Sequence, residues 1–261
     1  MANYIIKNSD NFLEYTAETS VNIDSDFPVA NLYNYTHPQK NCRSNDTSAT
    51  RIIIDLGSAT EVLAVVLTSC NFDTCNILGD AAADGFGDPD FTLNSQTINL
   101  DDRVMRYKGY IALTDFEYRY LAIEPSGIPT DGESFYWLDC LVCLDNITPL
   151  TRNPNFIIPH EHNQAYYDNE FSGGGIERIV RGLRKKFKVE LDYLVTADSG
   201  MESELNQLTG LHVGDPFIIY ENGAYGGDSS KVYLAYIETN LKWERRSNNL
   251  LGTVLTVEEI I

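Results

Sequence analysis

Short apolar runs, broken by Gly, Asp, Asn and Pro, recur along the first half of the chain. Runs of this length between such breakers are typical of β-strands. We expect strands at residues 4–7, 51–55, 61–68, 96–100, 107–113, 119–124 and 135–144. Because no long helices alternate with these strands, the pattern favours a two-sheet sandwich over a parallel α/β sheet.

The second half of the chain also opens with a strand pattern. In residues 185–194, apolar residues alternate with charged ones, as in a half-buried strand. The apolar members of this alternation are Phe187, Val189, Leu191 and Tyr193. Three further apolar runs predict strands at residues 216–222, 231–238 and 251–260.

One short helix is expected between these later strands. Asp198 or Ser199 can cap it, and Gly210 can end it. Prolines and polar turn formers at residues 147–155 indicate a domain junction. The predicted fold class is therefore all-β, with a β-sandwich at residues 1–148 and a carboxy-terminal β domain with one short helix at residues 149–261.

Charge narrows the possible partners. The chain has 38 Asp and Glu against 19 Lys and Arg, a formal net charge of −19. Such a surface repels nucleic acid, whose affinity for proteins comes mainly from neutralised phosphates. The first residues lack a basic region followed by an apolar run, and the longest apolar run, residues 62–67, is too short to span a bilayer. We expect no nucleic-acid partner, no membrane insertion, and assembly in a cytoplasm.

The five cysteines leave two arrangements open. Cys70, Cys75, Cys140 and Cys143 have spacings that could supply four metal ligands. However, Cys140 and Cys143 lie three apart in a predicted strand, so they point to opposite faces. Buried free thiols are favoured over a metal site, and the odd count, with Cys42 as the fifth, argues against a disulfide framework.

Other chemical patterns are weak. His160 and His162 would share a face of an extended segment, but few further ligands lie nearby, so a surface loop is favoured over a metal site. Residues 80–90 are acidic but lack the spacing and closing Glu of a calcium loop, which favours a solvated hairpin loop. No nucleotide-binding, hydrolase or metalloprotease motif occurs. We predict no enzymatic activity, no cofactor and no bound metal.

A run of six basic residues stands out in this acidic chain. A solvated strand face is one interpretation, and an electrostatic contact with an acidic patch on another subunit is the other. The candidate subunit-interface residues are Arg178, Arg181, Arg184, Lys185, Lys186 and Lys188.

The segment FPVANLYNYTHPQKNCRSND, followed by RIIIDLG and a second apolar strand, resembles the amino-terminal half of discoidin-like, galactose-binding-type jelly rolls. The matching elements are Ala30-Asn31-Leu32, Cys42-Arg43-Ser44, Asp55-Leu56-Gly57 and residues 62–67, with Cys42 where Trp is more usual. The resemblance implies a jelly roll in which apolar residues of the looped segment plug one end of the sandwich.

The same resemblance implies sugar-binding loops at one end of the jelly roll. The loops around residues 33–43, 72–74 and 84–90 would supply them. The candidate glycan-binding residues are Tyr33, Tyr35, His37 and Arg43. The alternative interpretation is that these aromatic residues cap the core.

The whole chain is similar to structural proteins of tailed bacteriophages from the tail tip or baseplate. The similarity rests on residues 135–150, 182–194, 202–222 and 251–261. It implies a non-catalytic virion protein at the distal end of the tail, assembled in the host cytoplasm. Copies of the chain would form a homo-oligomer that also contacts other phage tail proteins. A carbohydrate-binding module or adhesin for host surface glycans is the alternative, and a glycan-active enzyme is the third possibility.

Overall fold

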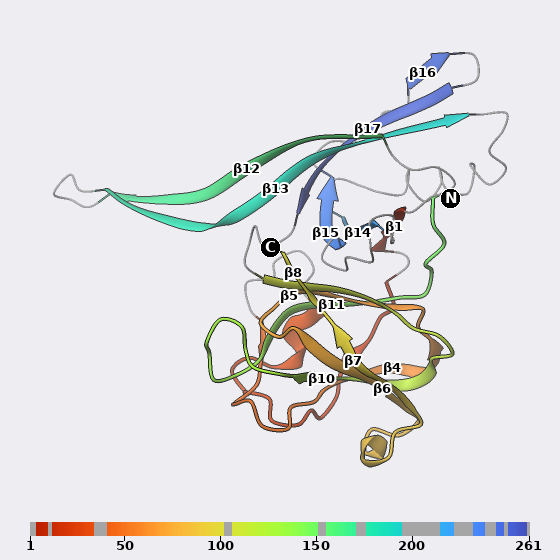
Figure 1. Ribbon diagram of the computed structural model, residues 1–261, viewed down its shortest axis with the longest axis vertical. Helices are drawn as coiled ribbons and strands as arrows, with labels where there is room; N and C mark the ends of the chain where they lie inside the picture. Colours follow the sequence, from red (N-terminus) through yellow and green to blue (C-terminus); the bar gives the residue numbers. More distant parts are fainter. Residues whose placement is uncertain are drawn as a thin grey trace.

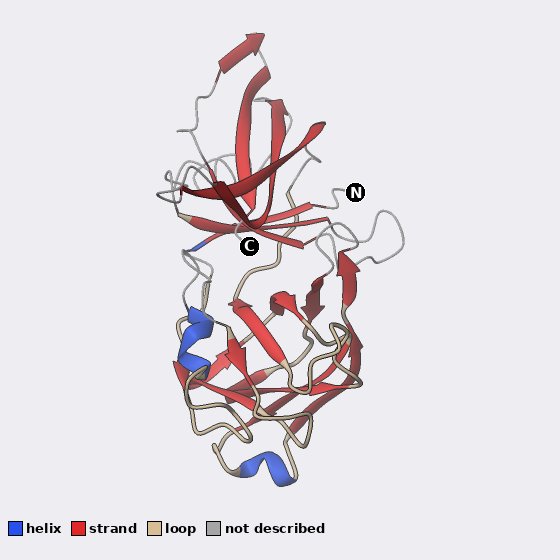
Figure 2. Cartoon of the chain, turned by 90° about the vertical axis from the view of Figure 1, so that its left-hand side faces the viewer, coloured by secondary structure: helices blue, strands red, loops and turns tan. Residues whose placement is uncertain are grey.

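The computed structural model describes residues 4–9, 12–33, 41–101, 106–150, 155–170, 176–194, 215–221, 232–237, 244–247 and 250–259. Two β-structured bodies are visible, a sandwich and a larger sheet lying across one side of it (Figures 1 and 2). Within these described ranges, helical structure is limited to short 3-10 segments such as η2 (Val29–Tyr33) and η3 (Gly85–Gly87). The predicted all-β fold class is confirmed.

The sandwich consists of two five-stranded antiparallel sheets. The first sheet has the order β2 (Thr16–Ala17), β4 (Ile52–Glu61), β10 (Glu117–Ser126), β6 (Thr74–Asp80), β7 (Phe91–Thr97). The second sheet has the order β3 (Cys42–Arg43), β11 (Trp137–Leu144), β5 (Ala64–Cys70), β9 (Arg106–Ala112), β8 (Asn99–Asp101).

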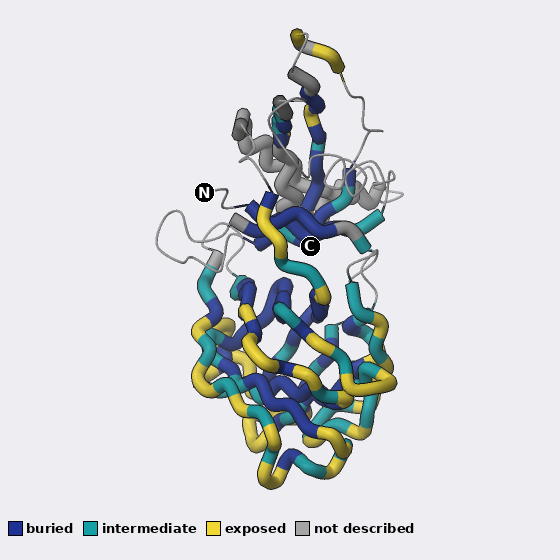
Figure 3. Tube along the Cα trace, turned by 90° about the vertical axis from the view of Figure 1, so that its right-hand side faces the viewer, coloured by how far each residue is buried: buried dark blue, intermediate teal, exposed yellow. Residues whose placement is uncertain are grey.

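The main core lies between these two sheets. Ile54 and Leu121 of the first sheet pack in one buried cluster with Leu67 and Leu141 of the second. Val29 and Leu32 of η2 join the same cluster, so the looped segment before β4 does plug the sandwich, as expected. The dark blue tube segments in Figure 3 follow this core through the sandwich.

Strand β6 has no counterpart among the strands that the sequence pattern predicts. Its sequence, TCNILGD, is interrupted by Asn76 and Gly79, so it lacks a clean apolar run. It nevertheless pairs with both β10 and β7, and Ile77 is fully buried in the main core. Tertiary pairing therefore outweighs a weak local signal here.

The larger sheet, called here the carboxy-terminal sheet, has seven strands. Its order is β1 (Tyr4–Asn8), β14 (Pro216–Glu221), β15 (Val232–Ile237), β17 (Leu250–Glu259), β13 (Ile176–Leu194), β12 (Asn155–Glu170), with β16 (Glu244–Ser247) beside β17. The strands expected at 185–194, 216–222, 231–238 and 251–260 are all found, while the helix expected after residue 198 lies outside the described residues.

The first strand of the chain belongs to the carboxy-terminal sheet, although a division at residue 148 assigns it to the first domain. β1 pairs with β14 in antiparallel register, with Ile6 opposite Ile219. The segment that leaves the sandwich is held beside β1, because the Leu150 amide donates a hydrogen bond to the Tyr4 carbonyl at 2.8 Å. The sandwich is thus inserted between the first strand and the remaining strands of this sheet.

The segment around His160 and His162 is a strand and not the surface loop that the sequence suggested. β12 pairs with β13 from Asn155 opposite Glu190 to Glu170 opposite Ile176. The pairing partner lies within the next 35 residues, and a mixed polar sequence gives no local sign of it. Figure 1 shows these two strands reaching well beyond the rest of the sheet.

An apolar contact joins the two bodies. Val66 and Val142 on the outer face of the second sheet share a buried cluster with Ile218 and Leu234 of the carboxy-terminal sheet. The rings of Tyr110 and Tyr220 stack across this contact, with centroids 3.8 Å apart and planes 10° from parallel. Beside them, the Lys108 ammonium forms a buried ion pair with the Glu259 carboxylate. The contact between the two bodies is thus mainly apolar and buried, as in the core of one domain, whereas contacts between mobile domains are more polar.

Gly85→Ala is expected to lower the free energy of unfolding by about 1–3 kcal/mol, because overpacking displaces neighbouring groups. A Cβ at Gly85 would lie 2.1 Å from Oδ1 of Asp80. That carboxylate is buried and accepts a hydrogen bond from the Ala82 amide at 2.8 Å, so it has little freedom to move. Gly87→Ala is the control, because a Cβ there meets nothing within 4 Å. Equal denaturant midpoints for the two variants would contradict this account.

Candidate functional site

The outer face of the second sheet carries a partly exposed strip of aromatic and arginine side chains. Leu138 and Cys42, which pair across β11 and β3, point into the main core. Their neighbours Trp137 and Arg43, also paired, therefore point outward on the opposite face. We call this strip, made of Phe27, Arg43, Phe135, Trp137 and Arg106, the aromatic–arginine strip.

Arg43 lies between two aromatic rings. Its guanidinium carbon is 4.0 Å from the centroid of the Phe27 ring and 4.3 Å from that of the Phe135 ring. The Arg43 Nε is buried and has no hydrogen-bond partner among the described residues. Contact with two rings restricts the orientation of the guanidinium.

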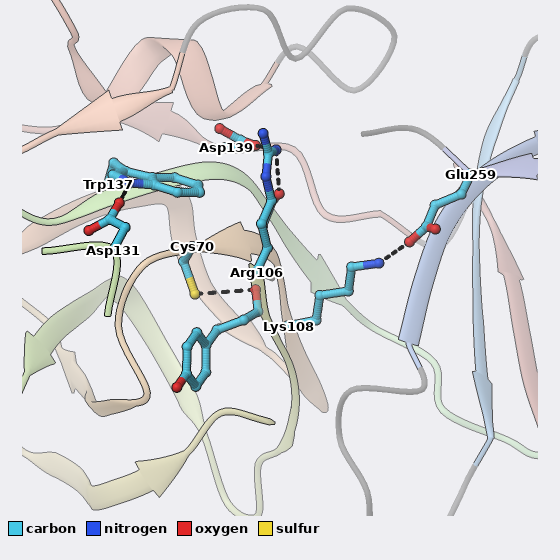
Figure 4. Close-up of polar contacts among 9 residues, drawn as sticks. Cys70, Arg106, Lys108, Asp131, Trp137, Asp139 and Glu259 are labelled. Carbon is cyan, nitrogen blue, oxygen red and sulfur yellow. Dashed lines mark hydrogen bonds and ion pairs between the residues drawn. The ribbon is translucent and has the colours of Figure 1, made fainter. Parts of the chain in front are cut away.

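Trp137 is held by a hydrogen-bonded network around Asn71. The Trp137 indole Nε1 donates to Oδ2 of Asp131 at 2.7 Å, as Figure 4 shows. Asn71, which is 1% exposed, donates to Oδ1 of Asp131 at 3.0 Å and to the Phe135 carbonyl at 2.9 Å. Its own Oδ1 accepts from the Trp137 amide at 2.8 Å. One buried amide thus positions the ring and the carboxylate together.

The Asp131 carboxylate is stabilised in its charged form. Partial burial acts to raise its pKa, but hydrogen bonds from Trp137 and Asn71 outweigh burial, so the pKa is lowered overall. Asp131 is therefore an acceptor at neutral pH, on the exposed side of the Trp137 ring.

Arg106 flanks Trp137 on the other side. Its guanidinium carbon is 5.6 Å from the ring centroid, and its Nη1 donates to Oδ2 of Asp139 at 3.1 Å and to Oγ of Ser69 at 2.9 Å. Figure 4 shows the Arg106 side chain running past the indole to reach Asp139. Burial raises the pKa of Asp139 to about 6, although the charge of Arg106 lowers it.

The raised pKa of Asp139 predicts a specific pH dependence. An unfolded Asp has a pKa near 3.9, so between about pH 4 and 6 the folded state holds a proton that the unfolded state has lost. Stability from this group is therefore greatest below about pH 4 and falls by ~3 kcal/mol as pH rises through 6. In urea titrations, Asp139→Asn should gain stability relative to the natural protein over this range. A difference that stays constant between pH 4 and 7 would contradict the assignment.

The glycan-binding residues expected from the sequence are only partly placed here. Arg43 lies in the strip, whereas Tyr35 and His37 lie outside the described residues. Tyr33 packs edge-on against Tyr15, with centroids 4.6 Å apart, and its hydroxyl is buried without a hydrogen-bond partner in the described structure. Burial, aided by the charge of Cys42, raises its pKa to about 12. Tyr33 thus matches the core-capping alternative.

The two other expected sugar-binding loops supply core residues. Phe72 is fully buried in the main core. Phe86 of η3 is buried on the outer face of the first sheet, against Leu78 and Tyr120. Most of the strip was therefore missed, although Phe135, Trp137 and Asp139 alternate in the sequence FYWLD and so indicate one outward strand face.

The metal alternatives gain no support. All five cysteines are free and buried, as favoured from the sequence. Cys143 faces the main core and Cys140 faces the contact with the carboxy-terminal sheet, so they point to opposite faces as predicted. Across the described ranges, no three His, Cys, Asp or Glu side chains are grouped to hold a metal ion.

The basic run lies along β13, and its predicted role in a subunit interface stays a prediction. Lys188 is exposed, while the side chains of Arg178, Arg181, Arg184, Lys185 and Lys186 lie outside the described features. In the part of the chain that the structure describes, no helix is long and apolar enough to cross a membrane.

Comparison with known proteins gives only distant similarities. No family model matches the chain, and no curated protein matches it. The solved structure titled "Crystal structure of SpGH29" is 13% identical over 54% of this chain, with a TM-score of 0.42, and this chain spans only 29% of that one. The lectin-binding domain of lectinolysin, in complex with Lewis b, is 10% identical over 54% of this chain and 99% of its own, with a TM-score of 0.40.

A third similar structure is SpX-3, a fucose-binding module of Streptococcus pneumoniae. It is 12% identical over 52% of this chain and 98% of its own, with a TM-score of 0.40. At such identities and scores these proteins determine neither the ligand nor the activity of this chain. The functional argument therefore rests on the residues of the aromatic–arginine strip.

Proposed function

We propose that the sandwich is a carbohydrate-binding module and that the aromatic–arginine strip is its binding site. The observation that carries the proposal is the position of Trp137, partly exposed on an open sheet face, with a carboxylate on its edge and an arginine on each side in the sheet. An aromatic face packs against the apolar face of a sugar ring, and flanking polar groups fix the hydroxyls. The proposed role is binding without catalysis.

A glycan array probed with the full chain tests this proposal. Trp137→Ala should weaken binding by about 10-fold or more, because a buried aromatic contact contributes about 1.5 kcal/mol or more. Trp137→Phe keeps a ring but loses the donor to Asp131, so it should bind with intermediate affinity. Thermal unfolding of each variant serves as the control for folding. Undiminished binding by a folded Trp137→Ala protein would exclude the strip as the site.

A second function is favoured by the β12–β13 arm. From Glu161 to Glu170, β12 pairs with β13, whereas β13 pairs with β17 only from Lys186 onward. The arm is thus a two-stranded ribbon beyond the sheet, and such ribbons are marginal without a partner. Four of the six basic residues, Arg178, Arg181, Arg184 and Lys185, belong to its β13 strand within an acidic chain.

This arm supports the proposal that the protein is a structural component of a bacteriophage tail, in which arms contact acidic surfaces of neighbouring copies. The location would be the distal end of the virion tail. Cryo-electron microscopy of purified particles should then show symmetric copies at the tail tip, joined through these arms. Absence of the chain from the particles would exclude this role and leave the carbohydrate proposal intact.

A further inference from the structure

We propose that Arg43 binds the oxyanion of an acidic sugar, either a carboxylate or a sulfate. The inference rests on the proposed carbohydrate function and specifies its ligand class. It starts from the pairing of the arginines in the sandwich. Three of those with described side chains form ion pairs, Arg51 with Glu124, Arg106 with Asp139 and Arg119 with Asp55. Arg43 has no such carboxylate among the described residues, in a chain with twice as many acidic as basic residues.

The geometry of Arg43 suits an external oxyanion. The Phe27 and Phe135 rings both contact the guanidinium, and its N–H groups lie along the edge of the guanidinium plane. A guanidinium edge matches the two oxygens of a carboxylate or sulfate, and a fixed plane loses less entropy on binding. The Nε is buried, so the donors left for a ligand are the terminal Nη groups of this half-buried side chain. The protein therefore holds a preorganised, unsatisfied cation at its surface.

The neighbouring residues define where the sugar ring lies. Trp137 is the direct cross-strand partner of Arg43, so their Cβ atoms are about 5 Å apart on one face. That spacing is close to the width of one sugar ring. Arg106 is neutralised by Asp139, and Asp131 already accepts from Trp137 and Asn71. Arg43 is thus the strip residue whose positive charge has no carboxylate partner among the described residues, and the Trp137 ring lies beside it.

The net charge of −19 opposes any anionic ligand. Charges beyond about 8 Å are largely screened at physiological salt, whereas a direct charge-assisted hydrogen bond is not. Contact with Arg43 therefore determines affinity under those conditions. The overall repulsion slows association mainly at low salt.

Titration calorimetry of the full chain with four probes tests the inference. The probes are a galacturonic acid trisaccharide, the same trisaccharide after carboxyl reduction, dextran sulfate and unmodified dextran. At least one acidic probe should bind about 10- to 100-fold more tightly than its neutral counterpart. One or two charge-assisted hydrogen bonds give a difference in affinity of about this size. Which acidic probe binds identifies a carboxylate or a sulfate as the recognised group.

Arg43→Ala should remove this preference, so that acidic and neutral probes bind with similar affinity. Arg43→Lys keeps the charge but lacks the planar fork, so it should recover only part of the preference. Arg119→Ala is the control, because Arg119 lies in the first sheet and is paired with Asp55. Melting temperatures of all variants separate loss of binding from loss of folding.

The outcomes distinguish this inference from the proposed function. Equal affinity for acidic and neutral probes, lost in Trp137→Ala but not in Arg43→Ala, would overturn the role of Arg43 and leave the carbohydrate site standing. Failure of the natural protein to bind any glycan, both in this titration and on the array, would overturn both.

Discussion

Lys108→Ala is expected to lower the free energy of unfolding by about 3–5 kcal/mol, because it leaves a buried carboxylate without its charge partner. The side chains of Lys108 and Glu259 are 4% and 2% exposed, respectively. Lys108 comes from β9 of the sandwich and Glu259 from β17 of the carboxy-terminal sheet, so their ion pair joins the two bodies. Figure 4 shows the ammonium directed at the carboxylate across this boundary. Urea unfolding monitored by tryptophan fluorescence measures the loss.

A double-mutant cycle measures the interaction energy between Lys108 and Glu259 separately from their contacts with other residues. Lys108→Met alone and Glu259→Leu alone should each be destabilising, whereas the double variant Lys108→Met/Glu259→Leu should recover most of the stability, because an apolar pair carries no unpaired charge. The expected coupling between the two positions is about 1–3 kcal/mol. Strictly additive effects would show that the two side chains do not depend on each other.

Asn71→Ala should cost about 2–4 kcal/mol, the second largest expected effect. The Trp137 amide and the Phe135 carbonyl would both lose a partner, and each unsatisfied buried group costs about 1–3 kcal/mol. Asp131 would also lose one of its donors. Because these groups hold Trp137 in place, glycan affinity should fall together with stability. Denaturant unfolding and the array titration measure the two effects.

Asn76→Ala is the matched control for Asn71. The Asn76 carboxamide accepts one exposed hydrogen bond, from the Ser95 amide at 2.9 Å. Its replacement should cost no more than about 1 kcal/mol and should leave glycan binding unchanged. If Asn71→Ala behaved like Asn76→Ala, the network around Trp137 would not be what organises the strip.

Most of the strands could be predicted from apolar periodicity and from the turn residues between the apolar runs. The spacing of Cys140 and Cys143 within one strand correctly placed them on opposite faces. The resemblance to discoidin-like jelly rolls implied that apolar residues of the looped segment plug the sandwich, and Val29 and Leu32 do so. These features are local, since each depends on residues within one strand or loop.

The remaining features depend on residues far apart in the sequence. The pairing of Tyr4–Asn8 with β14 joins segments about two hundred residues apart. The sequence of neither segment indicates which strand it pairs with. Arg43 was selected from the sequence, but its stacking on Phe135 and its pairing with Trp137 arise only when β3 meets β11. The aromatic platform could therefore be recognised only from the fold.

A crystal structure of the full chain with a glycan from the array tests the central claim most directly. The account predicts a sugar ring against Trp137, with one of its polar groups at the edge of the Arg43 guanidinium. A sugar bound elsewhere, for example at the loop carrying η3, with the strip left free, would contradict it.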